Sequence, residues 1–130
     1  MTDRTDPRRN AVVWAEIPVT DLDAASAFYE SVLGTTLPRV EMGGVATAVI
    51  PYVRGEGVSA NLQIGTPPAR PGTGVRVHLA VDGPLDAVAG RVRAAGGTVT
   101  GGVTALPVGR YVEACDRDGN PIGLFEAGPA

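Results

Sequence analysis

Residues 12–34 read VVWAEIPVTDLDAASAFYESVLG and combine a strand pattern with a helix pattern. From Val12 to Val19 hydrophobic and other residues alternate, which predicts a strand with two different faces. Asp21 is a typical N-cap residue, hydrophobic residues then recur at helical spacing, and Gly34 is typical of a helix end. The stretch therefore predicts a strand followed by a helix.

The same pattern returns 62 residues further on, so that Val19 corresponds to Val81. Residues 75–81, VRVHLAV, alternate again, and Pro84 opens a second helical stripe that stops at Gly96. Short β-like runs follow each helix, near 35–41, 45–52 and 58–64 in the first half and near 98–100, 111–116 and 122–126 in the second. We therefore predict an α+β fold of two tandem βαβββ modules. They would form a curved antiparallel eight-stranded sheet around a cleft, with one helix outside each module.

The two modules are expected to belong to a single domain. The first spans about 11–65 and the second about 75–126, joined by a Pro/Gly-rich linker over about 66–74. Each half alone is too small to bury much hydrophobic surface, which favours a shared core.

The alternation predicts which side chains face the cleft. Val13, Ala15 and Ile17 in the first strand, like Val75, Val77 and Leu79 in the repeat, would pack under the helices. The opposite face then carries Trp14 and Glu16 in the first module and their counterparts Arg76 and His78 in the second.

Glu16 and His78 have two interpretations. They can form an acid–base pair, since a carboxylate orients an imidazole, or they can form a structural bridge between the modules. Arg76 competes for Glu16, because guanidinium and carboxylate groups pair well. Trp14 is either a stacking platform for a ligand or a core residue.

Four further residues are candidates for contact or chemistry. Asn61 and Gln63 share a strand face and can hydrogen-bond a ligand or simply meet solvent. Phe125 lies in the cleft or in the core. Cys115 is expected to be a buried and unreactive thiol, because nothing in the sequence places a base beside it. Residues 116–120, DRDGN, predict a tight turn before the last strand.

The composition narrows the classes of function. The 130 residues are 44% hydrophobic and carry a formal net charge of −3, which argues against a nucleic-acid partner. There is no apolar run of the ~20 residues that span a bilayer, and the charged start lacks a signal-peptide core. One cysteine fits a reducing cytoplasm. All eleven basic residues are arginine, which excludes Schiff-base catalysis by lysine.

Three stretches resemble the vicinal oxygen chelate superfamily, which includes glyoxalase I, bleomycin-resistance proteins, extradiol dioxygenases and fosfomycin-resistance enzymes. They are IPVTDLDAASAFYESVLG, HLAVDGPLDAVAGRVRAAGGTV and ACDRDGNPIGLFE. The resemblance covers about Val12–Glu126 and implies the two-module fold. It also implies a homodimer, since members of the superfamily are often dimers.

The metal enzymes of the superfamily place one ligand on the first and one on the last strand of each module. The resemblance carries these positions onto Trp14, Arg76, Asn61 and Gly123, none of which is a usual metal ligand. We therefore expect no metal and no cofactor. The pattern resembles the binding-protein branch of the superfamily.

The leading hypothesis is a metal-independent protein that binds a small, partly aromatic molecule, such as an antibiotic or a secondary metabolite. Its ligand contacts would be Trp14, Glu16, Asn61, Gln63, Arg76, His78 and Phe125. The alternative is a metal-free isomerase, lyase or cyclase that uses Glu16 or His78 as the acid–base group. A metal-dependent glyoxalase or dioxygenase is a third hypothesis. Whether the cleft forms within one chain or between two chains stays open.

Overall fold

The computed structural model describes residues 10–128 and contains two βαβββ modules in succession. The first module consists of β1 (Ala15–Val19), α1 (Leu22–Leu33), β2 (Arg39–Met42), β3 (Val45–Val49) and β4 (Ala60–Ile64). The second consists of β5 (Val77–Ala80), α2 (Leu85–Ala94), β6 (Thr98–Leu106), β7 (Gly109–Cys115) and β8 (Pro121–Ala127). The α+β fold of tandem modules that the repeat predicts is confirmed.

Each module forms its own four-stranded sheet. The strand orders are β1-β4-β3-β2 and β5-β8-β7-β6, so the first and last strands of each module are neighbours. These neighbours run parallel, whereas the remaining pairs are antiparallel. The predicted single antiparallel sheet is therefore two mixed sheets. The repeat extends to the register, because Glu16 pairs with Asn61 and His78 pairs with Gly123 at the same spacing of 62 residues.

Each helix covers one face of its sheet. The Asp21 side chain accepts a hydrogen bond from the backbone N–H of Ala24 at 3.0 Å, and Gly34 ends α1 in the left-handed conformation at φ 69°. Ile17 and Val19 lie buried beneath α1, as the alternation predicts. The core continues into the second module through the apolar side of α2.

Two details of the predicted strands are wrong. Val13 and Val75 were expected to pack under the helices, but they are 73% and 86% exposed. They precede the paired parts of β1 and β5, so neither the sheets nor the helices cover them. In addition, β6 has nine residues instead of a short run. Its pairing with β7 continues past a register shift between Val99 and Val103, which accommodates the glycines there.

The turn at 116–120 joins the two modules. The turn is confirmed by the backbone N–H of Asp116, which donates to the carbonyl of Asn120 at 3.0 Å. The Asn120 amide also donates to the Pro18 carbonyl in β1 at 2.8 Å and to Asp116 at 2.9 Å. The Tyr29 hydroxyl of α1 donates to Asp116 at 2.6 Å. These groups are buried, so the turn is a polar joint inside the protein.

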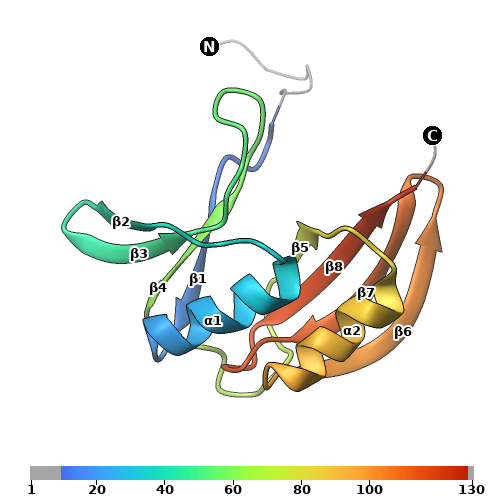
Figure 1. Ribbon diagram of the computed structural model, residues 1–130. Helices are drawn as coiled ribbons and strands as arrows, with labels where there is room; N and C mark the ends of the chain where they lie inside the picture. Colours follow the sequence, from blue (N-terminus) through green and yellow to red (C-terminus); the bar gives the residue numbers. More distant parts are fainter. Residues whose placement is uncertain (1–9, 129–130) are drawn as a thin grey trace, which may run out of the picture.

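Figure 1 shows the two helices next to each other and the two sheets diverging from them, with β2 and β6 at opposite sides of the molecule. A guanidinium N–H of Arg91 in α2 donates to the Val32 carbonyl of α1 at 3.3 Å, which links the helices. Among residues 10–128, no helix is long and apolar enough to cross a membrane.

Candidate functional site

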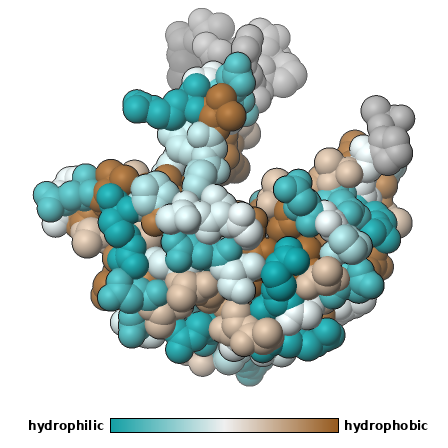
Figure 2. Space-filling view, in the orientation of Figure 1, coloured by the Kyte–Doolittle hydropathy of each residue, from teal (hydrophilic) through white to brown (hydrophobic). Residues whose placement is uncertain are grey.

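Two cavities lie where the first strand of one module approaches the first strand of the other. The larger has a volume of about 860 Å³ and the smaller about 420 Å³. Trp14 and Ser59 line the larger cavity from the first module, and Arg76 and His78 line it from the second. Figure 2 shows the surface hollowed between the upper arm of the first module and the second module. Three sequence-predicted residues, Trp14, Arg76 and His78, therefore share one cavity.

A chain of side-chain hydrogen bonds fixes Trp14. Its indole N–H donates to Oδ1 of Asn61 at 2.7 Å, and the amide of Asn61 donates to Oε1 of Gln63 at 3.0 Å. Asn61 is only 1% exposed, so it holds Trp14 and does not reach solvent. Tyr52 packs edge-on against the indole with ring centroids 5.4 Å apart. Two contacts thus hold the indole, and its single donor is already used.

Arg76 forms an ion pair within its own module. One guanidinium nitrogen lies 3.3 Å from a carboxylate oxygen of Glu113, and each side chain is about one-third exposed. The competition of Arg76 for Glu16 that the sequence suggests is therefore not seen, because β7 brings Glu113 close instead. At this exposure solvent weakens the ion pair, and Arg76 keeps capacity for another acceptor.

His78 lies over a glycine and against an aromatic ring. A Cβ atom on Gly123 would stand 2.1 Å from Nδ1 of His78, so the imidazole occupies the space that a side chain would need. The ring meets Tyr111 edge-on, with centroids 4.8 Å apart and planes at 89°. The site therefore favours one position of the imidazole.

Sequence reasoning missed Tyr111 and Glu113. Both come from β7, where alternation places them on one face, opposite Phe125 and Gly123 of β8. The antiparallel pairing of YVEAC with the strand after the DRDGN turn is the signal that could have found them.

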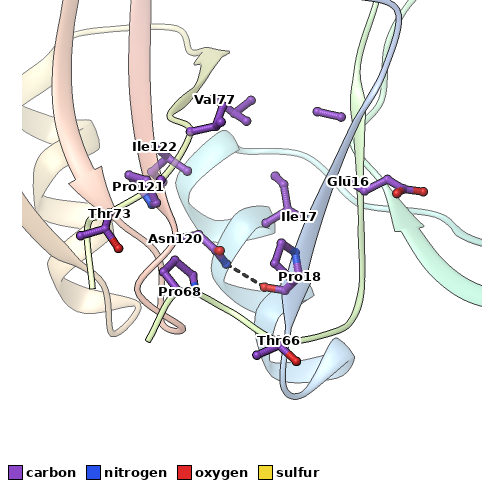
Figure 3. A pocket seen from close by; sticks show the side chains of 13 residues that line it. Glu16, Ile17, Pro18, Thr66, Pro68, Thr73, Val77, Asn120, Pro121 and Ile122 are labelled. Carbon is purple, nitrogen blue, oxygen red and sulfur yellow. Dashed lines mark hydrogen bonds between the residues drawn. The ribbon is translucent and has the colours of Figure 1, made fainter. Parts of the chain in front are cut away.

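The remaining predicted residues lie elsewhere. Glu16 belongs to the lining of the smaller cavity, but Figure 3 shows its carboxylate directed away from the other lining side chains. Ile17, Val77 and Ile122 give that cavity an apolar wall. Phe125 lines neither of the two cavities. Within residues 10–128 no hydrogen bond or ion pair joins Glu16 to His78.

The pKa shifts of Cys115 and Tyr29 disfavour nucleophilic roles for these two buried side chains. Burial raises the pKa of the Cys115 thiol, and the nearby Asp116 carboxylate raises it further. A thiolate nucleophile requires the opposite shift. Burial also raises the pKa of Tyr29 well above its usual range, again with a contribution from Asp116. Both residues are therefore structural, and Cys115 is buried as the sequence predicts.

The four positions that the metal enzymes of the fold use do not suit a divalent cation here. Oδ1 of Asn61 already accepts from Trp14, and the guanidinium of Arg76 would repel a cation. Gly123 has no ligand atom, and His78 fills the space above it. Residues 10–128 contain no group of three or more histidine, cysteine, aspartate or glutamate side chains arranged to hold a metal.

The fold and the cavities define the chain as a two-module βαβββ protein with a cavity between its modules. It belongs to the Glyoxalase/Bleomycin resistance protein/Dioxygenase superfamily, whose family model matches residues 11–124. None of the curated proteins compared with the chain is significantly similar to it.

Solved structures share the fold over nearly the whole chain. A glyoxalase/bleomycin resistance protein from Albidiferax ferrireducens T118 is 21% identical, with a TM-score of 0.65, and the match covers 92% of this chain and 100% of that one. UcmS2 is 26% identical, with a TM-score of 0.61 and coverages of 91% and 98%. The fosfomycin resistance protein FosX from Mesorhizobium loti is 16% identical, with a TM-score of 0.61 and coverages of 94% and 95%.

Proposed function

We propose that this chain is a metal-independent small-molecule-binding protein of the glyoxalase/bleomycin-resistance type. Its ligand would be a partly aromatic antibiotic or secondary metabolite. The observation that carries the proposal is the cavity of about 860 Å³ that Trp14, Arg76 and His78 line together. Its size falls in the range of small-molecule sites, and its lining combines apolar walls with a few polar groups.

Each predicted ligand-binding residue has a role in this proposal. Trp14 stacks on the ligand, while Asn61 and Gln63 hold the indole in place through their hydrogen bonds. Arg76 and His78 orient polar groups of the ligand. Glu16 and Phe125 lie outside the larger cavity and would reach only a ligand that extends along the sheets.

We also propose that the protein acts in the cytoplasm as a homodimer. Support comes from hydrophobic residues that are exposed on the outer parts of both sheets, including Val40, Met42 and Val45 on β2 and β3 and Val103 and Leu106 on β6. Exposed apolar surface of this kind often marks a protein–protein contact. A single peak of twice the monomer mass in light scattering is the expected result.

Equilibrium binding tests the proposed function. Trp14 is the single tryptophan, so its fluorescence reports the cavity directly. A panel of aromatic antibiotics and metabolites should contain members that change this fluorescence at micromolar concentration. In isothermal titration calorimetry, which does not depend on the tryptophan signal, Trp14→Phe should keep part of the affinity and Trp14→Ala should lower it about tenfold or more, because the stacking surface is lost. If no member binds better than millimolar, the proposal is wrong.

The second candidate function is a metal-free isomerase, lyase or cyclase. It is favoured by the presence of His78 and Arg76 in one cavity, where an imidazole could take a proton beside a guanidinium that stabilises an oxyanion. The carboxylate of Glu16 is directed away, so His78 is the stronger candidate for the base. Turnover of a bound ligand that His78→Ala abolishes, while binding persists, would support this function.

A further inference from the structure

Among residues 10–128, the ionisable side chains that line the larger cavity are Arg76 and His78, both basic. The chain carries a formal net charge of −3, but within residues 10–128 no aspartate or glutamate contributes to the lining of the cavity. In the part of the chain that the structure describes, Arg76 is the one arginine in the lining, and His78 is the other basic side chain there. A cationic ligand would find no carboxylate partner among these lining residues, and the Glu113 carboxylate near Arg76 is already paired with the guanidinium.

Two polar groups of the lining already have hydrogen-bond partners within the protein. The Trp14 indole N–H is bonded to Asn61, and the Ser59 hydroxyl donates to the Ile50 carbonyl at 2.6 Å. Arg76 approaches Glu113 at 3.3 Å through one nitrogen, and within residues 10–128 its guanidinium donates no hydrogen bond. Since a guanidinium has five N–H donors, most of its capacity remains for a ligand.

The aromatic part of the lining favours one kind of ligand group. Trp14 offers a ring surface and no free donor, and Tyr52 braces it from the edge. A planar ring is therefore the group that gains most from contact with Trp14. The guanidinium of Arg76 adds several N–H donors in one plane, and this arrangement matches a carboxylate or a similar planar anion.

We infer that the larger cavity selects planar aromatic anions, meaning ring systems that carry a carboxylate or a comparable acidic group. The ring lies on Trp14, the anionic group accepts hydrogen bonds from Arg76, and His78 provides a further polar contact. This inference rests on the proposed binding function and narrows its ligand class. It predicts discrimination by charge between molecules of the same shape.

Three probes with the same ring test this selection: 2-naphthoate, neutral 2-naphthamide and cationic 2-naphthylmethylammonium. The single tryptophan has one indole N–H resonance, so its shift in ¹H–¹⁵N spectra follows each titration at the site itself. We expect the naphthoate to bind about tenfold or more tightly than the amide, and the ammonium to bind most weakly, because charge-assisted hydrogen bonds exceed neutral ones.

Variants separate the loss of the Arg76 charge from the effect of leaving the Glu113 carboxylate unpaired. Arg76→Gln should remove the preference for the naphthoate over the amide. Because this change leaves Glu113 unpaired, Arg76→Gln together with Glu113→Gln distinguishes the loss of a cation from the exposure of an anion. The matched control is Arg110→Gln, which breaks the 2.6 Å ion pair with Glu126 on the same sheet but lies outside the cavity. This control should keep the preference.

The outcomes distinguish a failure of the charge preference from a failure of the proposed binding function. If all three probes shift the indole resonance with equal affinity, or if the ammonium binds best, the inference about charge is wrong and the binding function stands. A preference for the naphthoate that survives Arg76→Gln also overturns the inference. If no probe and no member of the metabolite panel shifts the indole resonance, both the inference and the proposed function fail.

Discussion

Removal of the Tyr29 hydroxyl should lower the free energy of unfolding by an amount that follows from its hydrogen bond to Asp116. The hydroxyl donates to Oδ2 of Asp116 at 2.6 Å, and both side chains are buried. A hydrogen bond to a charged acceptor contributes about 1.5–3 kcal/mol. Asp116 keeps donors from Asn120 and from the backbone of Asp118, so its carboxylate is not left without partners in Tyr29→Phe. We therefore expect a loss near the lower end, about 1.5–2 kcal/mol.

Thermal and urea denaturation followed by circular dichroism measure this loss. For a chain of this size the melting temperature should fall by about 5–9 °C, with an unchanged slope in urea. Tyr111→Phe is the matched control, because the Tyr111 hydroxyl makes no hydrogen bond within residues 10–128, and its effect should stay below about 0.5 kcal/mol. If Tyr29→Phe is as stable as the control, the joint between the modules does not stabilise the fold as we argue.

Three further predictions concern groups near the site and the joint. The raised pKa of Tyr29 favours the protonated form in the folded state. The contribution of Tyr29 to the free energy of unfolding should therefore be fully present below about pH 10 and be lost above it. In alkaline unfolding experiments Tyr29→Phe should reduce that loss. Gly123→Ala should displace the His78 ring and change the resonances of this single histidine, whereas Gly101→Ala, where a Cβ fits, should not; unchanged histidine shifts in both variants would contradict the geometry. Cys115 should react with thiol reagents far more slowly in the folded protein than in urea, since it is buried and its thiol pKa is raised; equal rates would show that the thiol is accessible.

The repeat made the fold predictable from the sequence. The spacing of 62 residues aligned Glu16 with His78, and the family resemblance implied the last-strand positions Asn61 and Gly123. The sheet registers pair Glu16 with Asn61 and His78 with Gly123 at the same spacing. The helix ends were also predictable, because Asp21 and Gly34 have local preferences that do not depend on the rest of the chain.

The site was less predictable, because its contacts depend on long-range pairing. The partner of Arg76 is Glu113, which lies on β7, and β8 separates β7 from β5 in the sheet. Alternation placed Glu16 on the same face as Trp14, but it could not tell which cavity each side chain would line. The exposure of Val13 and Val75 likewise depends on where pairing begins, which periodicity does not define.

The DRDGN turn has a consequence for how this protein can change. The turn fastens β1 and α1 to the second module through Asn120 and Asp116, while the larger cavity is lined by Trp14, Arg76 and His78. The joint between the modules and the lining of the larger cavity are therefore encoded in different segments of the chain. Trp14, Arg76 and His78 form none of the hydrogen bonds that hold the turn within residues 10–128, so substitutions at these three positions should leave the joint intact.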